Sequence, residues 1–110
     1  MALSSPSPVT SADVRLRAAD LAILCRRFGV SRLDLFGSAA VGVARPDSDL
    51  DFLVDFGDRQ ATGYADAYFG LLEELEALFG RHVDLVVASG IRNPFFRESV
   101  ERTKTLLYAA

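Results

Sequence analysis

The chain has 110 residues, a length that predicts one domain. Half of its residues are hydrophobic and a quarter are charged, as in an ordinary soluble globular protein. The formal net charge of −3 argues against a broad basic surface, so no direct contact with nucleic acid is expected. Cys25 is the only cysteine, which excludes an intrachain disulfide and a cysteine-based metal site.

The N-terminal segment is rich in Ser and Pro. Residues 1–10 are predicted to be frayed, ahead of one domain over residues 11–110. This segment has neither the basic nor the apolar part of a signal peptide. No run approaches the ~20 apolar residues that span a bilayer, so we expect a cytoplasmic protein without membrane association.

Apolar residues recur every three or four positions from Val14 to Phe28 and predict one helix that starts at Thr10 or Ser11. Further elements follow from alternation and from turn residues. They are strands over 31–36, 49–56 and 82–87, a short helix after residue 37, long helices over 64–79 and 94–102, and a strand or packed tail at 105–108.

This order predicts an α/β domain with a small mixed sheet flanked by helices. Within the helix Tyr64–Phe79, the apolar positions are predicted to pack and the glutamates to face solvent. The apolar set is Phe69, Leu72, Leu75, Ala77 and Phe79, and the acidic set is Glu73, Glu74 and Glu76.

Two carboxylates stand inside the strand over 49–56. Side chains alternate along a strand, so Asp49 and Asp51 share one face at ~6–7 Å, with Leu50 and Phe52 on the other face. An amphipathic strand with an acidic outer face would account for the pattern. However, Asp is unfavourable in strands and like charges repel, so the pair also fits oxygen ligands of Mg²⁺.

A Gly37-Ser38 pair follows the preceding strand. Glycine allows a ligand to approach the backbone, and the start of a helix offers free N–H groups to phosphate. A tight strand-to-helix turn with a serine cap is the simpler interpretation. Asp84, in the strand over 82–87, reaches the same cluster if its strand neighbours the first; otherwise it is an ordinary surface aspartate. Asp55 lies on the same face, farther along the strand.

Gly37-Ser38, ten intervening residues and Asp49-Leu50-Asp51 resemble the G-S-x10-D-x-D signature of the DNA polymerase beta-like nucleotidyltransferase superfamily. The stretch "LFGSAAVGVARPDSDLDFLVDF" is similar to that of the minimal nucleotidyltransferase (MNT) proteins. The resemblance implies that fold, ATP as substrate and two Mg²⁺ ions. The implied catalytic and metal-binding residues are Asp49, Asp51 and Asp84, and the implied nucleotide-binding residues are Gly37, Ser38 and Arg45.

The resemblance also implies a partner. Proteins of this kind pair with a small helical HEPN RNase toxin and neutralise it by transferring AMP from ATP to a tyrosine hydroxyl. Many relatives have Arg where this chain has Val41, which leaves open an antitoxin that acts by binding alone. A stand-alone transferase acting on a small molecule or RNA is the third hypothesis. The loop 57–63, the start of the helix after it and the segment Ile91–Arg97 are expected to contact the partner.

Overall fold

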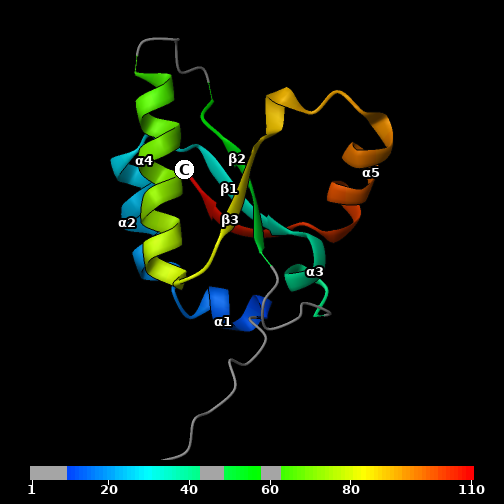
Figure 1. The fold of residues 1–110 in the computed structure, drawn as a ribbon, viewed down its shortest axis with the longest axis horizontal. Coiled ribbons are helices and arrows are strands. Elements are labelled where there is room, and N and C mark those ends of the chain that lie inside the picture. The colour runs from blue at the N-terminus through cyan, green and yellow to red at the C-terminus, as the bar shows by residue number, and fades with distance from the viewer. Residues whose placement is uncertain (1–9, 43–48, 58–62) are drawn as a thin grey trace, which may run out of the picture.

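The computed structural model describes residues 10–42, 49–57 and 63–110 and centres on a four-stranded sheet (Figure 1). The strand order is β3-β2-β1-β4. β1 pairs antiparallel with both β2 and β4, whereas β2 and β3 are parallel, so the sheet is mixed as predicted. The strands are β1 Arg32–Phe36, β2 Leu50–Asp55, β3 Val83–Val87 and β4 Thr105–Ala109.

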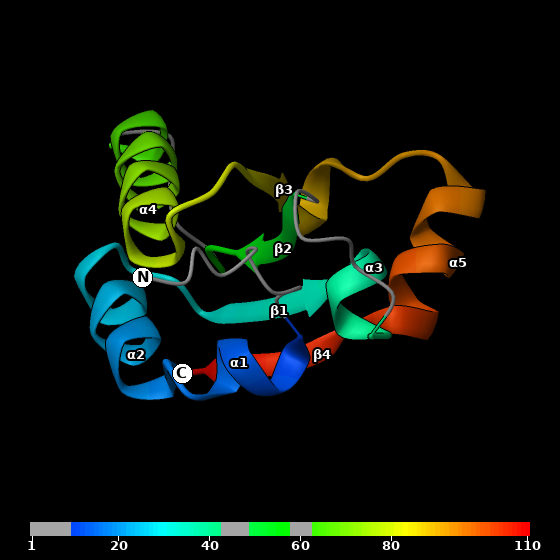
Figure 2. The same ribbon diagram turned by 60° about the horizontal axis from the view of Figure 1, so that its bottom comes forward.

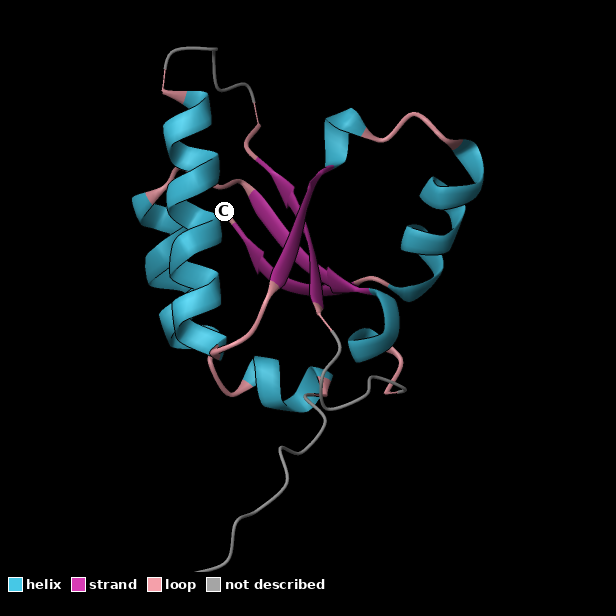
Figure 3. Cartoon of the chain, viewed as in Figure 1, coloured by secondary structure: helices cyan, strands magenta, loops and turns pink. Residues whose placement is uncertain are grey.

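Helices cover both faces of this sheet (Figures 1 and 2). α2 and α4 lie side by side on one face, and α3 and α5 lie toward the other. Figure 3 shows the same alternation of helix and strand along the chain. The helical elements are α1 Ser11–Arg15, α2 Ala18–Arg27, α3 Gly37–Ala40, α4 Tyr64–Phe79, the 3₁₀ turn η1 Ala88–Gly90 and α5 Pro94–Thr103.

The main core lies between the sheet and the α2–α4 layer. Leu50, Phe52 and Val54 of β2 are fully buried there, which confirms the inward face predicted for this strand. Burial of such apolar side chains is the dominant favourable term in folding. A smaller cluster forms on the opposite face beneath α5 and consists of Phe36, Leu53, Ile91 and Val100. The face of the sheet that carries Asp51 is therefore partly covered by apolar side chains.

The prediction of one continuous helix up to Phe28 was wrong. Thr10 caps α1 through a capping box with Asp13, but the chain leaves helical geometry at Arg17, which has φ −97° and ψ 18°. Leu16 is 83% exposed at this break. Figure 1 shows α1 at one end of the sheet and α2 alongside α4. The spacing of apolar residues indicates which side chains are buried. It does not indicate whether they belong to one straight helix or to two.

α4 has the predicted bounds but not all of the predicted contacts. Its buried residues are Ala67, Leu71 and Leu75, whereas Phe69 is 58% exposed. Glu76, predicted to face solvent, accepts a hydrogen bond from the Val83 backbone at 3.1 Å. Among the described helices, none is long and apolar enough to cross a membrane.

Candidate active site

The parallel pairing of β2 with β3 brings two of the predicted carboxylates together. Asp51 and Asp84 are register partners on these neighbouring strands. On the other side of β2, Asp51 is paired with Phe36, the residue before Gly37. Three segments that are far apart in the sequence thus meet at one level of the sheet. The condition set for Asp84, that its strand neighbours β2, is fulfilled.

α4 fixes the strand that carries Asp84 from the core side. The Tyr68 hydroxyl donates to the Leu85 carbonyl at 2.6 Å, and the Glu76 carboxylate accepts from the Val83 N–H. These bonds hold the backbone on both sides of Asp84. Burial, together with the charge of Asp84, raises the pKa of Tyr68, so this hydroxyl stays a donor. The position of Asp84 therefore depends on α4 as well as on β2.

Asp51 is the electrostatically strained member of the site. Burial raises the pKa of its carboxyl to about 6, and the negative charges of Asp84 and Asp49 add to this effect. A half-buried carboxylate beside two others is the environment that a cation stabilises. A positively charged ligand beside Asp51 would therefore stabilise its ionised form.

Gly37 lies directly against this carboxylate. Its φ is +74°, and a Cβ atom at this position would overlap Asp51 Oδ2. Glycine is needed here both for the left-handed backbone and for the close approach. The Gly37 N–H donates to the Thr103 hydroxyl at 3.2 Å, which links this turn to the end of α5. Ser38 follows as the second residue of α3 and is partly exposed.

Asp49 immediately precedes β2, and its carboxylate contacts a histidine. His82 Nδ1 lies 3.1 Å from Asp49 Oδ2. Among the described residues, no group of three or more His, Cys, Asp or Glu side chains is arranged to hold a metal ion. The donor set nevertheless fits Mg²⁺ chemically, because carboxylate oxygens are its preferred ligands and no cation of the described part of the chain compensates the charge of Asp51.

The other predicted residues that the structure describes lie away from this cluster. Arg45 is outside the described residues. Asp55 is at the far end of β2, where it accepts a hydrogen bond from the Gly57 N–H at 2.7 Å. Val41 is 52% exposed after α3. Arg97 donates to the Ile91 carbonyl and so serves the fold of its own segment.

The structure also shows a buried ion pair that the sequence pattern did not single out. Asp34 is 1% exposed, and Arg32 contacts both of its oxygens, at 2.7 and 3.1 Å. Asp34 is on the same face as Asp51 because it pairs with Leu53 of β2. It lines a hollow of about 130 Å³ with Asp55, Glu101 and Lys104. Since Asp34 already has a cationic partner, it does not compete for the role of Asp51.

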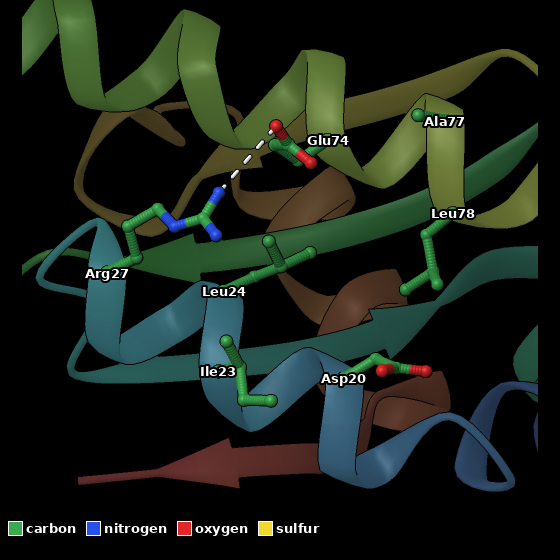
Figure 4. Close-up of a pocket in the computed structure, with 7 residues that line it drawn as sticks. All are labelled: Asp20, Ile23, Leu24, Arg27, Glu74, Ala77 and Leu78. Carbon is green, nitrogen blue, oxygen red and sulfur yellow. Dashed lines mark ion pairs between the residues drawn. The ribbon is translucent and has the colours of Figure 1, made fainter.

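A hollow of about 350 Å³ lies between α2 and α4, on the opposite side of the sheet (Figure 4). An Arg27–Glu74 ion pair of 3.7 Å crosses its rim. Among the described residues that line it, Asp20 and Glu74 are the only carboxylates. The candidate site is therefore placed at the carboxylates of β2 and β3. The hollow is lined by Asp20, Ile23, Leu24, Arg27, Glu74, Ala77 and Leu78.

Comparison with known proteins shows the family and the fold. Residues 21–107 match the family model described as "Nucleotidyltransferase domain", and the chain belongs to this family. It is therefore a nucleotidyltransferase. The chain is 43% identical over 70 residues to the protein adenylyltransferase MntA of Thermococcus cleftensis, covering 64% of this chain and 68% of the relative.

Solved structures show the same fold. A chain described as a candidate minimal nucleotidyltransferase is 37% identical, with a TM-score of 0.72, over 88% of this chain and 95% of that chain. A chain from the complex of tri-AMPylated Shewanella oneidensis HEPN toxin with MNT antitoxin has a TM-score of 0.61 at 20% identity. That match covers 87% of this chain and 72% of the other. The resemblance to minimal nucleotidyltransferases is thus confirmed.

Gly37→Ala should displace the Asp51 carboxylate, because the new methyl group would occupy the position of Oδ2. Gly42→Ala is the matched control, since Gly42 has a φ of +78° and no atom within 4 Å of its added Cβ. Both variants carry a backbone strain of roughly 1 kcal/mol. Only Gly37→Ala should shift the ¹³C titration of Asp51 and lower nucleotidyl transfer. Equal behaviour of the two variants would contradict the contact.

Asp51→Asn should change how stability depends on pH in the metal-free protein. The folded state holds a proton on Asp51 up to about pH 6, against a reference value of 3.8. Between these values the folded state binds more protons, so the free energy of unfolding of the wild type falls as pH rises. Asn carries no charge, so the variant should gain stability relative to the wild type across this window.

Urea unfolding in the presence of a chelator, at a series of pH values, measures this difference. Asp55→Asn is the control, because Asp55 stands on the same strand and face but is exposed. A difference between Asp51→Asn and wild type that is constant from about pH 4 to pH 7 would show that the Asp51 pKa is not raised.

Proposed function

We propose that this chain is a Mg²⁺-dependent protein adenylyltransferase that transfers AMP from ATP to a tyrosine hydroxyl of a HEPN-type toxin and thereby neutralises it. The observation that carries the proposal is the pairing of Asp51 with Asp84, with Gly37 held against Asp51. The relative named protein adenylyltransferase MntA supports the choice of AMP and of a protein acceptor. A solved complex with AMP-PNP, similar in fold, supports ATP.

In the proposed reaction the tyrosine oxygen attacks the α-phosphorus of ATP. A new phosphorus–oxygen bond forms, the bond to the β-phosphate bridging oxygen breaks, and pyrophosphate leaves. Asp49, Asp51 and Asp84 would hold Mg²⁺, which supplies positive charge to the phosphate oxygens when bound. Asp84 would also accept the proton of the attacking hydroxyl. Gly37 and Ser38 would bind the phosphate tail through the turn at the start of α3.

The segment Ile91–Arg97 is the proposed contact for the acceptor protein. Ile91 is buried, and Asn93 caps α5 by accepting from the Phe95 and Phe96 backbone N–H groups. The Phe96 ring packs edge-on against Phe36 at 5.9 Å between centroids. Phe95 is 80% exposed on this anchored segment. An exposed aromatic side chain on an anchored segment is well suited to bind a partner.

A binding-only antitoxin is the second candidate, and Val41 favours it. Many relatives carry a cation where this chain has an exposed valine, so a side chain that could contact phosphate or the partner is missing. The two candidates differ in one observable, which is a covalent change in the partner.

Co-expression of this chain with a cognate HEPN-type toxin should yield a complex whose toxin carries one or more added AMP groups. Intact-mass analysis of the toxin measures this directly. Asp51→Asn should lower the transfer rate by about a hundredfold or more, because a carboxylate ligand of the metal is lost. Asp55→Asn, on the same face of the same strand, should retain transfer.

Neutralisation of the toxin without any mass increment, in the presence of ATP and Mg²⁺, would favour the binding-only antitoxin. Wild-type transfer by Asp51→Asn would contradict the assignment of the site. If the chain neither binds nor modifies the toxin, the stand-alone transferase becomes the hypothesis to pursue.

Phe95→Ala should weaken association with the toxin by about tenfold or more, because exposed aromatic anchors contribute most of the affinity of such surfaces. Phe69→Ala is the matched control. Phe69 is also an exposed phenylalanine, but it belongs to α4 on the opposite side of the sheet. Titration calorimetry with a toxin inactivated at its RNase site measures both. Equal losses for the two variants would place the partner elsewhere.

A further inference from the structure

The only histidine of the chain lies within the candidate site. His82 immediately precedes β3, and its carbonyl accepts a hydrogen bond from the Leu50 N–H at 3.2 Å. This backbone bond aligns the starts of β2 and β3. As a result, the side chains of Asp49 and His82 stand beside each other, and His82 Nδ1 comes within 3.1 Å of Asp49 Oδ2.

The next level of the sheet repeats this arrangement with two carboxylates. Residues two apart along a strand share a face. Asp49 and Asp51 therefore follow one another beside β3, while His82 and Asp84 follow one another beside β2. Across the two strands, the Asp49 carboxylate faces the His82 imidazole, and the Asp51 carboxylate faces that of Asp84. The histidine thus contacts one carboxylate of the predicted metal-binding set.

The contact is not explained by a contribution to stability. The Asp49 and His82 side chains are 53% and 68% exposed, and exposed ion pairs of this kind contribute little to folding. Because the Asp49 side chain is exposed, packing does not fix the rotation of its carboxylate. A hydrogen bond to one of its oxygens would restrict that rotation. Groups that orient a metal ligand in this way commonly affect metal affinity and activity.

We propose that His82 is a positioning residue for Asp49: its Nδ1–H donates to Asp49 Oδ2 and leaves Oδ1 available as the metal ligand. This inference rests on the proposed function, since it assigns Asp49 to a metal. It adds a residue outside the G-S-x10-D-x-D pattern. His82 does not touch the reacting atoms, and it acts through Asp49.

The first test uses the metal-free protein and needs no activity. Because His82 is the single histidine, an untagged chain labelled with ¹⁵N in the imidazole gives one set of ring signals. At a pH where the ring is neutral, the wild type should carry its proton on Nδ1. Asp49→Ala should shift the proton toward Nε2, whereas Asp55→Ala should not. The same tautomer in the wild type and in Asp49→Ala would overturn the contact.

The second test measures Mn²⁺ affinity by electron paramagnetic resonance. His82→Ala should weaken binding by about tenfold, and His82→Asn should restore it, because the Asn amide nitrogen takes the place of Nδ1. Unchanged affinity in His82→Ala, or no restoration by His82→Asn, would overturn the proposal. So would tighter binding in His82→Ala, because His82 would then compete with the metal for Asp49.

These tests separate the inference from the function on which it rests. A chain that binds Mn²⁺ with the expected His82 pattern, but adds no AMP to any toxin, would contradict the proposed function and support the positioning role. A wild-type chain that binds no Mn²⁺ would contradict both.

Discussion

The parallel pairing of β2 with β3 sets Asp51 directly beside Asp84, and much of the molecule is arranged around that contact. Like charges at facing positions of neighbouring strands are destabilising. The raised pKa of Asp51 expresses the same cost, and burial is its main cause. The cost is offset on the other face of the same two strands, where Leu50, Phe52 and Leu85 are buried in the main core. The two strands that carry the site are thus held in place by apolar packing on the face opposite the carboxylates.

The turn after β1 borders Asp51 from the side of β2 opposite to Asp84. Gly37 is close enough to Asp51 that any side chain there would displace the carboxylate. Its N–H is bound by Thr103, at the end of α5, and the Phe36 ring contacts Phe96 near the start of α5. α5 therefore closes the smaller core and also fixes the turn that borders the carboxylates. A change in α5 would be transmitted to the site through two contacts that lie on either side of Val100.

The part of this arrangement that could be predicted from sequence is the local part. Alternation along β2 indicated which face Asp51 occupies, and Gly37 indicated a close approach of the backbone. The register that aligns Asp51 with Asp84 is a long-range property, and so is the bond from Gly37 to Thr103, 66 residues away. The contact of His82 with Asp49 is long-range as well, because it depends on which strand lies beside β3. The spacing of apolar residues led to a wrong prediction at Leu16, because residues are buried both before and after the point where the helix breaks.

The two faces of the sheet differ in a way that accounts for the need for a partner in the proposed reaction. α2 and α4 cover one face, whereas α5 covers the other around Leu53 and leaves Asp49 half exposed. Carboxylates that remain hydrated attract a cation only weakly, because water screens the charge. An acceptor protein that covers Asp49 would remove water from this end of the sheet. The attraction of the carboxylates for the metal would then strengthen at the moment the hydroxyl arrives, so that catalysis is coupled to binding of the correct partner.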